Sequence, residues 1–246
     1  MVQTDRGDVE IFETPAELAS GLAQFVTDCA SFAITERGAF YIALAGGTTP
    51  RAAYKLLGEE PLSTEISWDD TFIFFSDERC VSPNDPESNF KMTKDALLEH
   101  IKIPPHNVHR MRGEDDPTQA AAAYDKIIRE DLGQNPRFDL ILLGMGPEGH
   151  TASLFPGSVP ADDTKTLVAA PYISKLKSHR ITFTPRLINN ARRVAIVTEG
   201  GAKAPTFAAV MDGPLRPDLY PVQLVAPTDG ELQWMVDRLA ASQLDS

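Results

Sequence analysis

The stretch FDLILLGMGPEGHTASLFPG, residues 138–157, joins an apolar run to a loop rich in glycine. An apolar run that ends at glycine is typical of a strand buried on both faces of a sheet. Gly144, Gly146 and Gly149 form a G-x-G-x-x-G pattern directly after this strand, and His150 follows the last glycine. The pattern has two interpretations, a loop that binds a dinucleotide or a tight turn that presents a histidine.

The residues around this pattern favour the histidine loop. A dinucleotide fingerprint needs a helix directly after the glycines and an acidic residue about 20 positions further on, at the end of the next strand. Pro147 stands inside the pattern, and a Pro-Gly pair at 156–157 leaves little room for a helix. The acidic candidates, Asp162 and Asp163, lie in a segment predicted to be a loop. We therefore expect no nicotinamide or flavin cofactor.

Strand-like and helix-like segments alternate along the whole chain. In the first helix, apolar residues recur at intervals of three and four between Leu18 and Ala33, and Thr14 and Pro15 are typical of its N-terminus. The alternation predicts an α/β fold, a single domain over residues 1–246 with a mainly parallel sheet and helices on both faces. Predicted strands cover 39–47, 71–78, 138–144, 179–185, 192–200 and 221–227, and predicted helices cover 14–38, 48–60, 87–100, 118–133, 202–213 and 229–242.

The composition restricts partners and location. The 246 residues include 23 basic and 35 acidic side chains, for a net charge of −12. This charge repels nucleic acid and anionic membranes, so an anionic substrate would need a few basic residues gathered in one site. The N-terminal stretch has no signal-peptide pattern, no apolar run is long enough to span a membrane, and the two cysteines have no metal-binding spacing. We expect a cytoplasmic monomer without disulfides.

Four polar clusters follow predicted strands. They are GGTTPR from residue 46, SDER from residue 76, GMGPEGH from residue 144 and TEGGAK from residue 198. Ligands of α/β proteins bind at the carboxyl ends of the parallel strands. We therefore expect the four clusters to meet at one edge of the sheet and to form a site there.

The first two clusters can each bind an anion. Gly46 and Gly47 allow backbone N–H groups to approach a phosphate, and Thr48 opens a helix whose N-terminus favours negative charge, although the same residues would also make an ordinary capped turn. No Gly-Lys pair occurs, so the segment is not a Walker loop. Asp77 can orient a substrate hydroxyl or support Arg79, which can grip a phosphate; the alternative is a solvated ion pair.

The third cluster carries the candidate general base. Histidine titrates near neutral pH, so His150 can take a proton, and Glu148 can orient His150 or the substrate. Ser153 lacks the G-x-S-x-G elbow of a serine nucleophile, which leaves water as the simpler nucleophile. Arg180 and Lys203 are candidates for contact with an anion and are equally consistent with surface residues. Three other histidines lie within 100–109, but no carboxylate or cysteine completes a metal site there.

Four segments taken together resemble the 6-phosphogluconolactonases of the glucosamine-6-phosphate isomerase/6-phosphogluconolactonase family. The segments are LAGGTTP, FFSDERCVSPNDPESNF, LILLGMGPEGHTASLFPG and RITFTPRLINNARRVAIVTEGGAKA, in this order. The resemblance implies a sugar-phosphate isomerase type of α/β fold. It also implies hydrolysis of the small-molecule sugar-phosphate lactone 6-phospho-D-glucono-1,5-lactone in the pentose phosphate pathway, without metal or cofactor.

The same resemblance implies roles for individual residues. His150 matches the general base of the family, and Asp77 matches the carboxylate beside the substrate. The family usually has aspartate where this chain has Glu148. The positions that match the phosphate and sugar site are Gly46, Gly47, Thr48, Arg79, Arg180 and Lys203.

Two other functions are consistent with the sequence. One is an isomerase or deaminase that acts on a hexosamine phosphate, and the other is a non-catalytic sensor of sugar phosphates. The net acidity and the lack of a recognisable DNA-binding segment argue against a sensor that regulates transcription.

Overall fold

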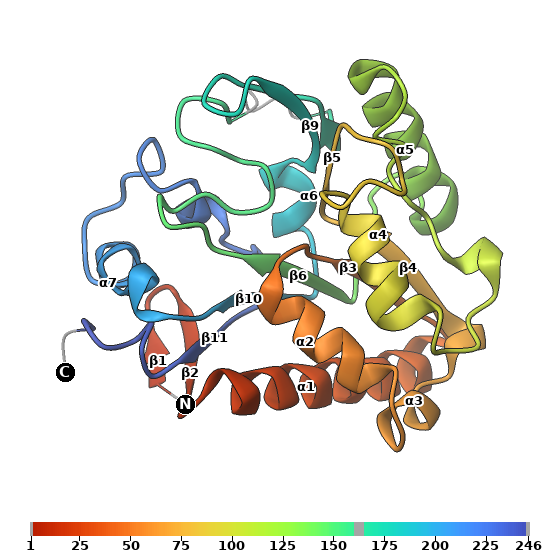
Figure 1. Ribbon diagram of the computed structural model, residues 1–246, viewed down its shortest axis with the longest axis horizontal. Coiled ribbons are helices and arrows are strands. Elements are labelled where there is room, and N and C mark those ends of the chain that lie inside the picture. Colours follow the sequence, from red (N-terminus) through yellow and green to blue (C-terminus); the bar gives the residue numbers. More distant parts are fainter. Residues whose placement is uncertain (1, 160–164, 245–246) are drawn as a thin grey trace.

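The computed structural model describes residues 2–159 and 165–244, so Asp162 and Asp163 lie outside the described residues. A seven-stranded sheet runs in the order β1-β2-β11-β10-β6-β3-β4 (Figure 1). Every neighbouring pair in it is parallel except β1 and β2. The strands are β1 Val2–Thr4, β2 Gly7–Phe12, β3 Phe40–Leu44, β4 Thr71–Phe75, β6 Leu140–Gly144, β10 Arg193–Thr198 and β11 Glu231–Asp237. The prediction of a mainly parallel sheet is confirmed.

A second, smaller sheet is antiparallel. Its strands are β5 Asp77–Arg79, β7 Val168–Ala169, β8 Tyr172–Ile173 and β9 Ser178–Phe183. Each of the other three pairs with β9. The strand predicted over 71–78 thus ends at Phe75, and the chain passes through Ser76 into the second sheet. The segment at 179–185 also belongs to this sheet and is not a parallel strand of the main one.

Helices cover both faces of the main sheet. In Figure 1, α1 and α2 lie below the sheet, whereas α5, α6 and the second sheet lie above it. The α-helices are α1 Pro15–Arg37, α2 Thr48–Leu57, α3 Leu62–Glu65, α4 Asn89–Thr93, α5 Pro117–Leu132, α6 Pro185–Asn189 and α7 Ala204–Met211, and the other helical turns are η1 Trp68–Asp70, η2 Lys94–Leu98, η3 Pro105–Asn107, η4 Gly201–Lys203 and η5 Pro221–Leu224. Among the described residues, no helix is long and apolar enough to cross a bilayer.

The apolar strands contribute to a separate core on each face. In β6, Ile141 and Leu143 pack with the α5, α6 and α7 side, while Leu140 and Leu142 pack with the α1 and α2 side. Successive side chains of a strand point to opposite faces, so a strand covered on both sides must be apolar at every position. This is the physical reason for the uninterrupted run ILL that precedes the glycine-rich loop.

Two predicted elements near the C-terminus are wrong. The sequence predicts a helix over residues 229–242, but the segment contains β11. β11 lies between β10 and β2, so pairing on both edges outweighs the helical pattern. The predicted strand at 221–227 instead begins with the short helix η5, which starts at Pro221. The N-terminal strands β1 and β2 were not predicted.

Candidate active site

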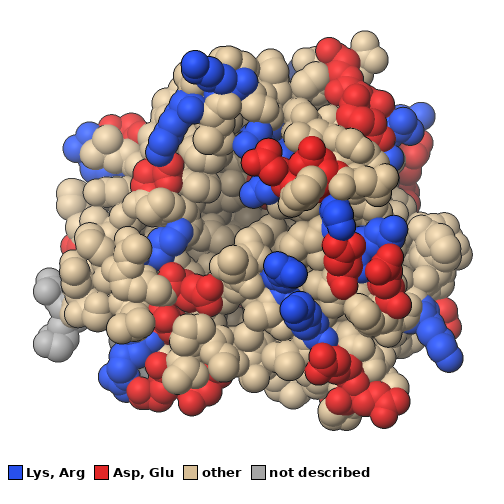
Figure 2. Space-filling view, in the orientation of Figure 1, with Lys and Arg blue, Asp and Glu red and all other residues tan. Residues whose placement is uncertain are grey.

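The four polar clusters meet at the carboxyl ends of β3, β6 and β10 and at β5. They surround a cavity of about 320 Å³, which we call the strand-end lobe. An adjoining cavity of about 300 Å³, the hairpin lobe, is bounded by the turn between β8 and β9. Figure 2 shows a hollow near the centre of this face, with basic side chains on several sides.

The two lobes divide the candidate residues between them. Asp77, Arg79 and His150 border both lobes. The strand-end lobe adds Gly46, Gly47, Thr48 and Lys203, and the hairpin lobe adds Glu148 and Arg180. All nine residues singled out in the sequence therefore lie in one continuous region of the structure.

The glycine-rich loop is shaped around the imidazole of His150. A side chain at Gly146 would overlap Cε1 and Nδ1 of this ring. The Gly146 N–H donates to the His150 carbonyl oxygen at 2.8 Å, which closes the loop. Gly149 has φ +78°, a backbone conformation that favours glycine. The glycines thus allow a histidine to fold back over the loop, as the histidine interpretation requires.

The surroundings of His150 favour its neutral form. The ring stacks on Phe155, with centroids 4.1 Å apart, and burial lowers its pKa below the usual 6.5. The charges of Glu148 and Asp77 oppose this shift without cancelling it. Nδ1 lies 3.0 Å from Oε2 of Glu148, an ion-pair distance, although the orientation falls short of hydrogen-bond geometry. A neutral imidazole near pH 7 can accept a proton.

Glu148 is held between two basic groups. Its Oε1 accepts a hydrogen bond from Nζ of Lys175 at 3.0 Å, while its Oε2 faces His150. Burial raises the pKa of Glu148, but the bond from Lys175 and the charge of His150 outweigh burial and lower this pKa to about 2. The group is therefore a carboxylate at neutral pH. Lys175 was missed in the sequence, because a lysine in a turn between strands has no distinguishing pattern.

Asp77 is anchored by side chains from two other segments. Its Oδ2 accepts from Oγ of Ser153 at 2.6 Å, and its Oδ1 accepts from Nδ2 of Asn89 at 3.2 Å. Ser153 is buried, and its hydroxyl donates to a carboxylate. The Ser153 hydroxyl thus anchors Asp77, and water remains the simpler nucleophile. Asn89 also explains why residue 46 is glycine, because a side chain at position 46 would overlap the Asn89 amide.

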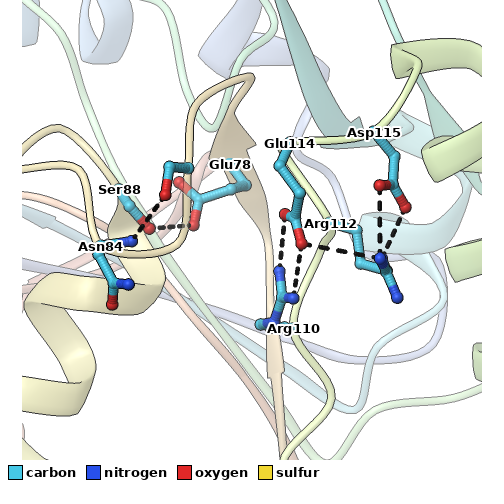
Figure 3. A network of polar contacts seen from close by, with 8 residues as sticks. Glu78, Asn84, Ser88, Arg110, Arg112, Glu114 and Asp115 are labelled. Carbon is cyan, nitrogen blue, oxygen red and sulfur yellow. Dashed lines mark hydrogen bonds and ion pairs between the residues drawn. The ribbon is translucent and has the colours of Figure 1, made fainter.

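Glu78 points away from the cavity and ties the following loop to β5. It accepts hydrogen bonds from the Ser88 hydroxyl and from the backbone N–H groups of Arg79, Asn89 and Phe90. Burial raises its pKa, and these hydrogen bonds act in the opposite direction. Figure 3 shows Glu78 against Ser88, near a separate chain of ion pairs that runs from Arg110 to Asp115. Glu78 therefore positions Asn89, and Asn89 positions Asp77.

The three basic candidates have no carboxylate partner. Arg79 donates to the Glu87 carbonyl oxygen, Arg180 donates to a carbonyl and a hydroxyl within β9, and Lys203 donates to the Met145 carbonyl oxygen at 2.7 Å. Within the described part of the chain, none of the three forms an ion pair. Burial lowers the pKa of Lys203 and of Arg180, and for Arg180 the charge of Arg79 adds to the effect. Half-buried positive charges that lack carboxylate partners favour the binding of an anion.

The N-terminus of α2 opens into the strand-end lobe. Its N-cap is Gly47, with φ +110° and no side-chain cap, so the first N–H groups of the helix keep their capacity to donate. Thr48 donates through Oγ1 to Oε1 of Glu199 at 3.1 Å. Glu199 belongs to the TEGGAK cluster and lines the lobe, although the sequence did not distinguish it from its neighbours.

The described residues contain no grouping of three or more His, Cys, Asp or Glu side chains that could hold a metal ion. Of the histidines at 100–109, His109 lies 3.0 Å from Asp131 and stacks on Phe74. The contacts of His109 are those of a side chain that packs against a helix and a strand.

Comparison with known proteins agrees with this architecture. Residues 13–234 match the family described as glucosamine-6-phosphate isomerases/6-phosphogluconolactonase. The chain is 36% identical over 256 residues to probable 6-phosphogluconolactonase 2 of Oryza sativa subsp. indica, covering 97% of this chain and 90% of the relative. It is 34% identical over 204 residues to 6-phosphogluconolactonase of Haemophilus influenzae, covering 83% of this chain and 87% of the relative.

A solved structure is similar over almost the whole chain. The 6-phosphogluconolactonase from Trypanosoma cruzi has a TM-score of 0.88 at 27% identity, covering 99% of both chains. The chain therefore belongs to the glucosamine-6-phosphate isomerase/6-phosphogluconolactonase family. The expected family, fold class and enzyme type are confirmed by these relatives.

Proposed function

We propose that the protein hydrolyses 6-phospho-D-glucono-1,5-lactone to 6-phospho-D-gluconate, in the pentose phosphate pathway of the cytoplasm. One observation carries the proposal: a neutral, partly buried imidazole shares a cavity with basic residues that have no carboxylate partner. A lactone carbonyl needs a base to activate water, and a phosphate needs cations and N–H donors. The names of the relatives support the same reaction.

In the proposed reaction, His150 accepts a proton from water while the water oxygen attacks the lactone carbonyl carbon. The tetrahedral oxyanion is stabilised by a nearby cation, for which Arg79 is suited because it borders both lobes. The intermediate collapses with cleavage of the bond between C1 and the ring oxygen, and His150 returns the proton to this oxygen. Glu148 holds the imidazole, and Asp77 orients the sugar.

The phosphate is proposed to be held away from the reacting carbon. Gly46, Gly47 and Thr48 offer N–H groups and a hydroxyl at the start of α2, and Arg79, Arg180 and Lys203 offer charge. Binding energy from a remote phosphate positions the carbonyl against the base.

One copy of the chain is proposed to be sufficient for activity, as a single domain over residues 1–246. All the candidate residues come from one chain, which supports this proposal. Light scattering after gel filtration should give a mass near 26.9 kDa for the active species. Activity confined to a larger species would contradict a monomer.

The decisive test uses lactone that is generated in situ, with correction for spontaneous opening. Replacement of His150 by alanine should lower kcat by about 10²- to 10⁴-fold, the usual contribution of a general base. His106→Ala, at an exposed position, is the matched control. The proposal is wrong if a folded wild-type protein does not accelerate the reaction. Release of ammonia from glucosamine 6-phosphate would favour the deaminase alternative instead.

The phosphate site is tested with glucono-1,5-lactone, which lacks the phosphate. The wild type should prefer the phosphorylated lactone. Lys203→Ala and Arg180→Ala should reduce this preference by raising KM for the phosphorylated substrate alone. An equal loss on both substrates would assign these residues to another role.

A further inference from the structure

A third cavity, of about 520 Å³, lies at the opposite edge of the main sheet. It is bordered by the residues at which β6, β10 and β11 begin, whereas the lobes of the candidate active site lie at the carboxyl ends of the strands. Four arginines line it: Arg37, Arg137, Arg192 and Arg193. We call this space the arginine cavity.

One buried carboxylate serves two of the four guanidinium groups. Asp139 is 6% exposed, and its Oδ1 lies 2.9 Å from Nε of Arg37 and 3.4 Å from Nε of Arg192. Its Oδ2 accepts from the backbone N–H of Tyr41 at 2.9 Å. Both arginines contact Asp139 through Nε, and no hydrogen bond among the described residues uses their terminal amino groups, which are available for another acceptor.

Within the described residues, the ion pairs of the other two arginines are with exposed carboxylates. Arg137 contacts Asp229, whose side chain is 91% exposed, and Arg193 contacts Glu231, whose side chain is 71% exposed. Ion pairs of this kind contribute about 0–1 kcal/mol. An anion that enters the cavity can therefore replace these two carboxylates at little cost, while Arg137 keeps its bond to the backbone carbonyl oxygen of Asp229 and Arg193 keeps its contact with Sγ of Cys29.

An exposed aromatic ring helps to hold the guanidinium groups in place. Phe32 is 53% exposed, and the guanidinium carbons of Arg37 and Arg193 lie 5.5 and 5.6 Å from its ring centroid. Cation–π contacts at this distance are attractive. Phe32 therefore restricts two long side chains that would otherwise lose conformational entropy when a ligand binds.

Two buried donors in the cavity lining are unsatisfied. Nε of Arg137 and Nε of Arg192 are buried and make no hydrogen bond within the described residues, although Nε of Arg192 lies 3.4 Å from Oδ1 of Asp139. Because neither atom is accessible from the cavity, a ligand there would be bound by the terminal amino groups of the arginines. Guanidinium groups match the oxygens of a phosphate in geometry as well as in charge.

We propose that the arginine cavity binds the phosphomonoester group of a small metabolite, at a site separate from the active site. Four guanidinium groups face three carboxylates, and two of these carboxylates are exposed and displaceable. This local excess of positive charge stands out in a chain with a net charge of −12. A dianion uses more of these donors than a single carboxylate would, which selects phosphate over a carboxylic acid.

The proposal is tested by titrating ¹⁵N-labelled protein with inorganic phosphate at constant ionic strength, balanced with chloride. Backbone amides of residues 29–37, 137–139, 191–193 and 229–231 should shift in a saturable manner, with their own Kd. In Arg137→Ala/Arg193→Ala this Kd should rise about tenfold or more, while shifts at residues 46–49 and kcat stay unchanged. Arg216→Ala removes an arginine with an exposed acidic partner elsewhere and should leave the Kd as in the wild type.

A charge-retaining variant distinguishes the loss of a phosphate contact from a folding defect. Arg137→Lys/Arg193→Lys keeps both charges but loses the planar fork, so its Kd should lie between those of the wild type and the alanine variant. The proposal is wrong if chloride alone produces the same shifts, if the shifts are confined to the active-site loops, or if folded alanine and lysine variants bind phosphate as tightly as the wild type.

Discussion

Two neighbouring ionisable groups of the candidate site, Glu148 and His150, are driven to different protonation states by their surroundings. Burial raises the pKa of Glu148, but the hydrogen bond from Lys175, a backbone N–H and the neighbouring His150 together outweigh burial and lower this pKa to about 2, whereas burial lowers the pKa of His150. A fixed carboxylate beside a neutral imidazole separates the group that orients from the group that accepts a proton. The roles proposed for the two residues follow from this separation.

The pH dependence of the rate should follow the protonation of His150. A histidine with a lowered pKa loses its proton at a lower pH than a free imidazole, so the base is already available at neutral pH. We expect kcat/KM to rise with pH, to pass its midpoint below 6.5 and then to level off. Rates corrected for spontaneous opening will test this, and a midpoint clearly above 6.5 would contradict the burial of the imidazole.

Glu148→Gln should move this midpoint further down. The negative charge of Glu148 raises the pKa of His150, so its removal leaves burial less opposed. The ring also loses its neighbour, and kcat should fall roughly tenfold to a hundredfold from poorer alignment. Glu148→Asp keeps the charge and should shift the midpoint less, while Glu130→Gln, on an exposed part of α5, is the control. If the pH dependence of kcat/KM is unchanged in Glu148→Gln, Glu148 has no role in the mechanism.

At the scale of an element, the conformation of the loop after β6 depends on position 146 being glycine. In Gly146→Ala the new methyl group would overlap the imidazole of His150, which must then turn away. We expect kcat to fall about a hundredfold, because misplacement of a reacting group by about 1 Å has effects of this size. Gly201→Ala adds a methyl group where no atom lies within 4 Å and should be nearly neutral. Comparison of kcat and Tm for the two variants separates misalignment from unfolding.

Strands that are apolar at nearly every position could be predicted from the sequence, whereas the strands nearest the two ends of the chain could not. The runs at β3, β4, β6 and β10 are apolar at nearly every position because both faces are covered. They are too short for a typical helix and end at glycine or polar residues, which favours strands. β11 carries polar residues at its start and apolar ones at helical spacing, so only its pairing with β10 and β2 makes it a strand.

Some residues of the candidate site could likewise be predicted from the sequence, and others could not. Residues at strand ends, such as Asp77 and His150, were placed together by the rule that parallel strands share one ligand-binding edge. Asn89 and Lys175 reach the site from a short helix and a turn, through contacts that depend on how the loops fold back. No spacing in the sequence reports such contacts.

At the scale of the whole molecule, stability depends on two cores that share one sheet. Trp234 of β11 is almost fully buried, tilts against Phe207 and donates from Nε1 to the Arg6 carbonyl oxygen at 2.7 Å. Trp234→Ala should lower the free energy of unfolding by about 3–5 kcal/mol in urea titrations. Leu239→Ala, at a side chain that is 59% exposed, should change it by less than about 0.5 kcal/mol. A small loss at Trp234 would contradict its place in the core.

The contact between Gly46 and Asn89 also restricts the order in which the two positions can change. Any side chain at position 46 collides with the asparagine amide, and the same amide anchors Asp77. A substitution at 46 is therefore acceptable only after residue 89 has become smaller, and a smaller residue 89 first leaves the Asp77 carboxylate without that donor. During evolution, the substitution at position 89 would weaken the site before a substitution at position 46 could be accommodated. The two positions are therefore linked by epistasis.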